Sequence, residues 1–139
     1  MSYLVDTNVL SELRKGRRCD PNVFRWFSAI PDEDVFLSVL VIGEIRRGIE
    51  RIRRRDVGSA KALEAWLRRL LVGHRDRILS IDEAIAEEWG RLSAADPIPV
   101  VDGLMAATAR VKGPTLATRN VRDVALTGVP VVNPFEPAG

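Results

Sequence analysis

The sequence predicts an α/β fold in which a mainly parallel central sheet lies between two layers of helices. Short apolar segments alternate along the chain with longer segments whose apolar residues recur every three or four positions. This alternation is typical of a parallel sheet whose strands are connected by helices. The chain has 139 residues, 46% of them hydrophobic, and shows no internal linker or repeat. We therefore expect residues 1–139 to form a single three-layer domain.

Five short apolar runs are predicted to form the strands of this sheet. Each is bounded by polar residues, glycine or proline, which mark turns and helix starts. The run that contains Pro130 is expected at an edge of the sheet, because proline has no N–H to donate to a neighbouring strand. The predicted strands are residues 3–5, 35–38, 77–81, 115–118 and 129–133.

Seven segments with helical periodicity or clear start signals are predicted to form the helices. Asp20–Pro21 is a strong start, because aspartate is a favoured N-cap and proline is favoured at the first helical position. Ser38 and Asp82 are predicted to cap two further helices, and Asp102 is predicted to open the most apolar one. The predicted helices are residues 7–14, 21–29, 39–52, 62–71, 83–92, 104–111 and 121–125.

Basic side chains are concentrated in the first half of the chain. The formal net charge is only +2, but residues 1–77 carry +5 and residues 78–139 carry −3. Residues 46–55 hold six arginines against one glutamate. Such a run is usually the solvated face of a helix, although guanidinium groups also suit phosphate oxygens. Charge alone therefore leaves nucleic-acid binding open.

The single cysteine and the single histidine exclude several kinds of site. Cys19 has no second cysteine for a disulfide, and His74, expected on a surface loop, cannot form a zinc site of several histidines. No apolar run approaches the about 20 residues that a membrane helix needs. The N-terminus begins without the basic and apolar regions of a signal peptide. We expect a cytoplasmic protein that has no contact with a membrane.

Four acidic or amide side chains are predicted to meet at one edge of the sheet. Asp6 and Asn120 follow strands directly, and open parallel sheets bind ligands beyond the carboxyl ends of their strands. Glu44 and Asp102 lie near the starts of helices that return over the same edge. Carboxylates in one cleft repel each other unless a cation compensates, and oxygen ligands suit Mg²⁺ or Mn²⁺. The pattern predicts a metal-dependent enzyme acting on a phosphodiester, although each residue taken singly also fits a helix cap, a first helical turn or a loop turn.

Five segments, in this order along the chain, resemble the PIN-domain family. The similarity looks closest to the VapC and FitB toxins of type II toxin–antitoxin systems, and it covers nearly the whole chain, which implies a three-layer PIN-like fold. The segments are LVDTNVLSE at 4–12, GEIRRG at 43–48, VDGLMAATA at 101–109, LATRNVRD at 116–123 and VVNPF at 131–135.

The resemblance implies a Mg²⁺- or Mn²⁺-dependent endoribonuclease that acts as a toxin. It implies a small cognate antitoxin of the VapB or FitA kind that silences the toxin. It also implies homodimers and, with the antitoxin, larger assemblies that bind promoter DNA only through the antitoxin.

The resemblance also assigns residues to a site. The metal positions of the family fall on Asp6, Glu44 and Asp102, and Thr7 matches a hydroxyl residue that helps to orient the site. Arginines near this cleft are expected to hold the phosphates that flank the cleaved bond. These arginines are Arg46, Arg47, Arg53, Arg54, Arg55 and Arg119.

The fourth position of the site departs from the pattern of the family. The family often has an acid at or near the position of Asn120, which here is an amide, and Asp123 lies one helical turn further on. We count Asn120 with the catalytic residues and Asp123 with the metal ligands, and either one is expected to complete the site.

Three other functions fit parts of the sequence. One is a non-catalytic PIN-like module that only binds RNA or protein. Another is an aspartyl-phosphate enzyme of the haloacid dehalogenase type, but that chemistry needs an acid two residues after the nucleophile, where this chain has Asn8. The third is a partner-binding scaffold that uses the amphipathic helix around residues 63–71.

Overall fold

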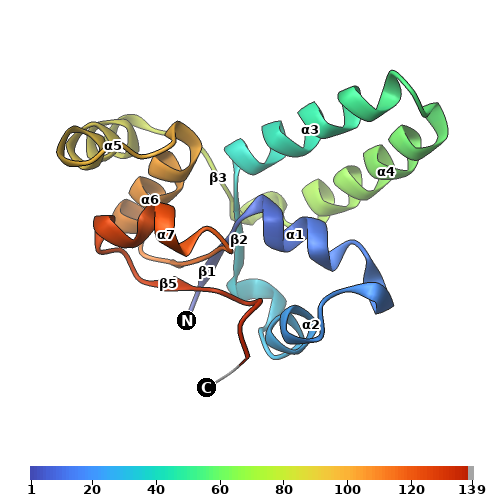
Figure 1. Cartoon of the computed structure of the whole chain (residues 1–139), viewed down its shortest axis with the longest axis horizontal. Coiled ribbons are helices and arrows are strands. Elements are labelled where there is room, and N and C mark those ends of the chain that lie inside the picture. The colour runs from blue at the N-terminus through green and yellow to red at the C-terminus, as the bar shows by residue number, and fades with distance from the viewer. Residues whose placement is uncertain (138–139) are drawn as a thin grey trace.

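The fold is a five-stranded parallel sheet covered by helices on both faces (Figure 1). The computed structural model describes residues 1–137. The strand order is β3-β2-β1-β4-β5, and all four pairs of neighbouring strands are parallel. The predicted fold class is confirmed. The strands are β1 (Tyr3–Val5), β2 (Val35–Ser38), β3 (Ile78–Leu79), β4 (Thr115–Ala117) and β5 (Val131–Val132).

The two edge strands are shorter than their apolar runs predicted. Arg77 was predicted to begin β3, but it ends a 3-10 turn, from which its Nε donates to the Val35 carbonyl at 3.1 Å. At the opposite edge, Pro130 precedes β5, and its carbonyl accepts from the Leu116 N–H at 3.0 Å. Edge strands pair on one side only, so the sheet requires less of their length. The predicted edge position of the Pro130 segment is confirmed.

The helices begin largely where the capping residues predicted. The side chains of Asp20, Ser38 and Asp82 each accept a backbone N–H in the first turn of the helix that follows. The helices are α1 (Thr7–Leu13), α2 (Pro21–Ser28), α3 (Val39–Arg53), α4 (Val57–Gly73), α5 (Glu83–Ala95), α6 (Val100–Lys112) and α7 (Val121–Val124), with short 3-10 turns at Gly16–Arg18, Asp32–Asp34, Arg75–Arg77 and Ala125–Thr127.

Two helices begin earlier than predicted. Helix α6 starts at Val100, with Pro99 as its N-cap, so Asp102 lies inside the first turn and does not open the helix. The fixed φ of proline makes such a start possible without a side-chain cap. Helix α4 starts at Val57, where the side chain of Asp56 accepts from the Ser59 N–H at 3.0 Å. Its first turn has only Val57 and Ala60 as apolar residues, and Val57 is exposed, which is why the apolar periodicity did not reveal this start.

The helices divide between the faces according to the direction in which the chain moves across the sheet. From β1 the chain passes to β2 and then β3, and helices α1 to α4 lie on one side of the sheet in Figure 1. It then crosses to β4 and β5, and helices α5 to α7 lie on the other side. Right-handed crossovers in opposite directions place their helices on opposite faces. The direction reverses between β1 and β4, so the topological switch point lies beyond the carboxyl ends of these two strands.

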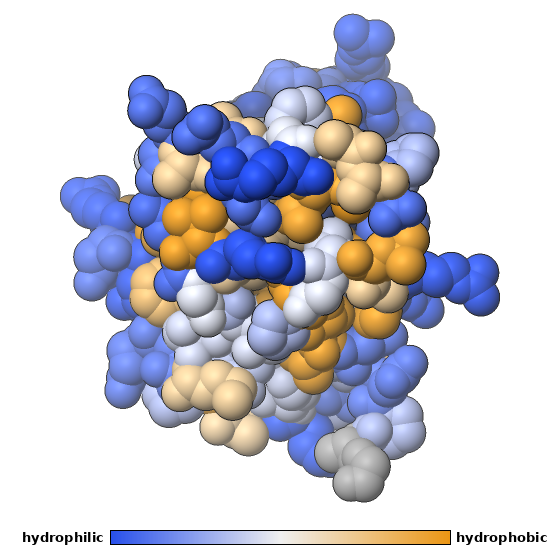
Figure 2. Space-filling view, turned by 90° about the vertical axis from the view of Figure 1, so that its left-hand side faces the viewer, coloured by the Kyte–Doolittle hydropathy of each residue, from blue (hydrophilic) through white to orange (hydrophobic). Residues whose placement is uncertain are grey.

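The core lies between the sheet and these helices. Its fully buried members come from strands and helices alike, as with Leu4 of β1, Ile49 of α3 and Met105 of α6. Figure 2 shows the outside of the half that contains α5, α6 and α7, where hydrophobic groups are interspersed with hydrophilic ones. Within residues 1–137, no helix has the length and apolar character needed to cross a membrane.

Candidate active site at the switch point

Asp6 lies at the centre of the site, directly after β1 and as the N-cap of α1. Only 5% of its surface is exposed. Its Oδ1 accepts from the Thr7 N–H at 2.8 Å, and its Oδ2 accepts from the Thr118 hydroxyl at 2.7 Å and from the Asn8 amide at 3.3 Å. Burying a carboxylate is unfavourable unless its oxygens are hydrogen-bonded. The donors that satisfy Asp6 therefore also fix its position.

The segment after β4 supplies the second half of this arrangement. The Thr118 hydroxyl, which donates to Asp6, accepts from the Asn120 N–H at 3.0 Å. The Arg119 N–H donates to the Asn8 side-chain oxygen at 3.1 Å. Residues more than 100 positions apart are thus connected across the switch point. Thr118 and Asn8 were not predicted as site residues, and their only sequence signal is that polar side chains follow two neighbouring strands.

Asp102 faces this centre from the first turn of α6. Burial, together with the negative charges of Asp6 and Asp123, raises the pKa of its carboxyl to about 6, while a hydrogen bond from the Asn120 amide acts in the opposite direction. Asp102 is therefore close to both candidates for the fourth position. The structure brings Asp6, Asp102, Asn120 and Asp123 together and places both Asn120 and Asp123 on an exposed rim.

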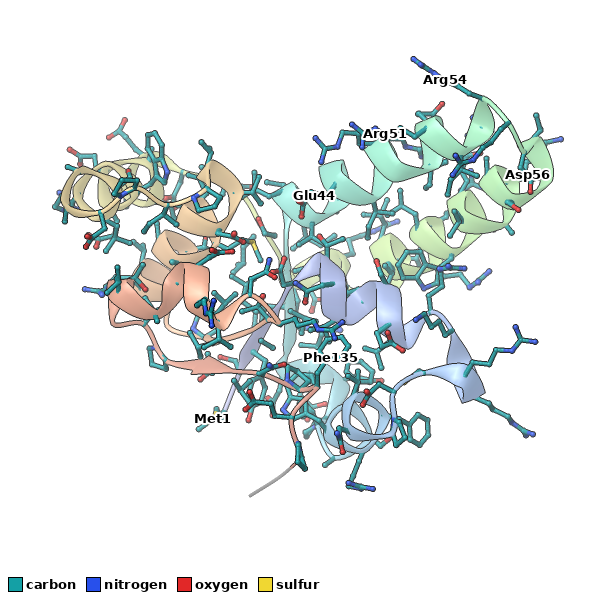
Figure 3. The ribbon with its side chains drawn as sticks, viewed as in Figure 1. Met1, Glu44, Arg51, Arg54, Asp56 and Phe135 are labelled. Atoms are coloured by element: carbon teal, nitrogen blue, oxygen red, sulfur yellow. The ribbon has the colours of Figure 1, made fainter. Side chains whose placement is uncertain are left out.

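Glu44 lies near the start of α3, above the start of α1 (Figure 3). Its Oε1 accepts from the Thr7 hydroxyl at 2.6 Å. Thr7 was predicted to orient the site beside Asp6, and in the structure its hydroxyl positions Glu44, while its backbone N–H binds Asp6. One residue thus joins the two carboxylates.

The carboxylate and amide oxygens gathered at this site are of the kind that a hard divalent cation binds. Asp6, Asp102 and Asp123 are close enough for their charges to interact, and this repulsion is what a cation would relieve. Among residues 1–137, no three carboxylate, histidine or cysteine side chains are already arranged to hold an ion. Glu44 is instead held by Thr7. Mg²⁺ commonly keeps several waters and uses only one or two carboxylates, so this arrangement suits it.

Two of the predicted RNA-binding arginines are paired with glutamates between α3 and α4. Arg46 contacts Glu64 at 2.5 Å and Glu50 at 3.2 Å, and Arg53 contacts Glu50 at 3.1 Å and Glu64 at 3.0 Å. The hydrogen bond from Arg46 lowers the pKa of Glu64, and that from Arg53, followed by that from Arg46, lowers the pKa of Glu50. These arginines join the two helices, and their binding of RNA stays a prediction.

The other predicted arginines are exposed. Arg47 lies on α3, and Arg54 and Arg55 lie at the turn into α4, where Figure 3 shows Arg54 pointing outward. The Arg119 guanidinium lies 4.4 Å from the centre of the Phe135 ring, at the rim of the switch point. Arg51, which was not predicted to bind RNA, is also exposed on α3 (Figure 3).

Known proteins are similar to this chain in sequence and in fold over almost their whole length. The chain is 32% identical to the VapC ribonuclease Y4jK of Sinorhizobium fredii, covering 97% of this chain and 99% of that protein. It is also 32% identical to the toxin FitB of Neisseria gonorrhoeae, covering 95% and 97%. The solved structure of FitAB bound to an IR36 DNA fragment superposes with a TM-score of 0.88 at 28% identity, covering 99% of this chain and 98% of that one.

The family assignment rests on the match and on the geometry together. Residues 3–125 match the PIN domain, a span that runs from β1 to the end of α7. It includes the acidic residues that the fold gathers at the switch point. The chain belongs to the PIN domain family.

Proposed function

We propose that this protein is the toxin of a type II toxin–antitoxin system and acts as a Mg²⁺- or Mn²⁺-dependent endoribonuclease. The observation that carries the proposal is the interaction of Asp6, Asp102 and Asp123 at the switch point of the sheet, next to a Glu44 held by Thr7. The relatives named VapC ribonuclease and toxin FitB align over nearly the whole chain, which supports the same activity here.

The residues have distinct roles in this proposal. Asp6 and Asp102 would hold the cation, and Asp123 or the Asn120 amide would complete the site. Glu44, fixed by the Thr7 hydroxyl, orients the attacking water and accepts its proton. When bound, the cation would lower the pKa of water and neutralise charge on the cleaved phosphate. The fixed hydrogen bonds around Asp6 keep this geometry ready before RNA binds.

We also propose the partners that the relatives suggest. The solved relatives include FitAB bound to DNA and a toxin–antitoxin complex from Klebsiella pneumoniae at 29% identity. This chain is expected to bind a FitA- or VapB-like antitoxin, to contact promoter DNA only through it, and to form homodimers. It is expected to act in the cytoplasm, where its RNA substrate is found.

The test is RNA cleavage by the purified protein, with and without a divalent cation. The parent should cut RNA in Mg²⁺ or Mn²⁺ and lose activity in EDTA. Asp6→Asn should reduce cleavage at least roughly 100-fold, because one ligand charge is removed at the centre of the site. The matched control is Asp76→Asn, the same change at an exposed carboxylate. Equal activity of Asp6→Asn and the parent would contradict the proposal, and calorimetry showing no cation binding would favour the non-catalytic module.

A further inference from the structure

The arginines of α3 fall into two stripes that differ in their partners. At about 100° per residue, Arg46 and Arg53 lie on nearly the same side of the helix, where they meet glutamates. Arg51 lies about 20° from Glu44 in this projection, and Arg47 lies about 60° from it. Among residues 1–137, neither Arg47 nor Arg51 forms an ion pair. Their charges are therefore available on the side of α3 that carries the site glutamate.

Gly48 lies between these arginines, one turn after Glu44. A Cβ atom built on Gly48 would meet nothing within 4 Å, so packing does not require glycine here. Glycine in the middle of a helix destabilises it relative to alanine. No side chain therefore projects from α3 at this position between Glu44 and Arg51, although a Cβ there would meet nothing and would strengthen the helix.

We propose that Arg47, Gly48 and Arg51 form a track for the RNA backbone that leads to Glu44. The inference rests on the proposed ribonuclease function and names the surface that holds the substrate. Arg47 and Arg51 bind phosphates beside the cleaved one, and Gly48 leaves room for the strand to lie close to α3. Arg51 is about 10 Å along the helix axis from Glu44, whereas Arg54, at the outer end, is about 15 Å away.

The first experiment measures binding of a labelled single-stranded RNA as a function of salt. An Asp102→Asn background prevents cleavage during the measurement. Arg47→Gln with Arg51→Gln should flatten the slope of log Kd against log salt by about 0.7 for each phosphate that the protein no longer neutralises, about 1.4 in total. The matched control is Arg68→Gln with Arg69→Gln, which removes the same charge from exposed positions on α4 and should leave the slope unchanged.

The outcomes separate this inference from the proposed function. Suppose that the parent cuts RNA, but the Arg47→Gln/Arg51→Gln variant has the same salt slope as the parent, or the Arg68→Gln/Arg69→Gln control flattens the slope equally. The proposed track is then wrong, while the proposed function stands. If the parent neither binds nor cuts RNA, the proposed function fails and the track fails with it. A changed oligomeric state of the Arg47/Arg51 variant in light scattering would make this face a contact between copies and would overturn the track.

The glycine provides an independent test. Gly48→Leu should raise the melting temperature, because leucine is a better helix former and its Cβ would meet nothing within 4 Å, and should lower kcat/KM for RNA at least roughly fivefold by obstructing the track. Gly90→Leu on α5 is the matched control, since a Cβ there also meets nothing within 4 Å, and it should leave RNA cleavage unchanged. A Gly48→Leu protein that is folded and fully active would overturn the role of Gly48.

Discussion

The switch point and the α3–α4 hairpin use charge in opposite ways. At the switch point, a nearly fully buried Asp6 is held by hydrogen bonds from the ends of two neighbouring strands. In the hairpin, Arg46 and Arg53 lie near the surface and pair with two glutamates. The sequence is far more charged in the hairpin, yet the chemistry is predicted where a few carboxylates gather around the buried Asp6. Burial and fixed geometry, more than the density of charge, identify the site.

The largest expected effect on stability comes from removing the Thr118 hydroxyl, one of the donors to Asp6. Thr118→Val deletes the hydroxyl at 2.7 Å from a buried carboxylate oxygen while keeping the shape of the side chain. It should lower the free energy of unfolding by about 2–3 kcal/mol, because the carboxylate is deprived of a hydrogen bond that water cannot easily replace. Urea unfolding measures the change.

The control for this substitution lies three residues earlier, in β4. Thr115→Val, at the start of β4, changes a threonine that is only partly buried and should alter stability by less than about 0.5 kcal/mol. If the two variants are equally stable, the hydrogen bond from Thr118 to Asp6 does not contribute to the stability of the fold.

A smaller effect is expected from Asp102 and depends on pH. Its pKa is about 6 in the folded protein against 3.8 as the ordinary value, so the folded state binds this proton more tightly. The resulting stabilisation is fully present below about pH 4 and disappears as the pH rises through 6. Because the side chain is partly exposed, we expect the decrease to be roughly 1–2 kcal/mol, not the full value of the shift.

Asp102→Asn tests this effect directly. The variant should be more stable than the parent at pH 7 in EDTA, and its stability should change less between pH 4 and pH 7. Added Mn²⁺ should raise the melting temperature of the parent more than that of the variant, by mass action. Equal metal-induced shifts in the two proteins would show that Asp102 is not a ligand.

The sequence predicted the sheet and the convergence at the switch point because both follow from local rules. Apolar runs and helix caps define the strands and the starts of α2, α3 and α5, and the ends of parallel strands necessarily meet at one edge. The start of α6 was missed because Pro99 begins it without a side-chain cap. The misjudged boundaries depend on a backbone constraint at α6, on an edge position at β3 and β5, and at α4 on the Asp56 cap, which the apolar periodicity did not reveal.

The detailed hydrogen bonds and ion pairs could not be predicted because their partners are far apart in the chain. The Thr118 hydroxyl meets a carboxylate 112 positions earlier, and Arg46 meets Glu64 across a helical hairpin, 18 positions later. The six arginines among residues 46–55 gave no indication of which ones would pair with glutamates. Only the packing of α3 against α4 shows which arginines are paired.

A third prediction concerns the bond between Thr7 and Glu44. Thr7→Val removes the donor at 2.6 Å and should reduce RNA cleavage at least roughly tenfold, because Glu44 is then without the group that orients it. Stability should fall by only about 1 kcal/mol, since the bond is partly exposed. Thr7→Ser keeps the hydroxyl and should restore most of the activity. A Thr7→Val enzyme with the activity of the parent would show that this bond does not position Glu44 for the reaction.

The smallest effect is expected from the paired arginines of the hairpin. Arg46→Gln with Arg53→Gln removes both cationic partners of Glu50 and Glu64, leaving two like charges near each other. Because these groups are well solvated, the melting temperature should fall by only a few degrees, and the difference should shrink further in high salt. Thermal unfolding at two salt concentrations measures the change in melting temperature.

RNA binding by the Arg46/Arg53 variant should keep its salt dependence, in contrast to the Arg47/Arg51 variant, because Arg46 and Arg53 are already paired with glutamates within the protein. A salt slope that flattens as much as it does for Arg47/Arg51 would mean that RNA displaces the glutamates, and the two stripes of α3 would then act as one basic surface.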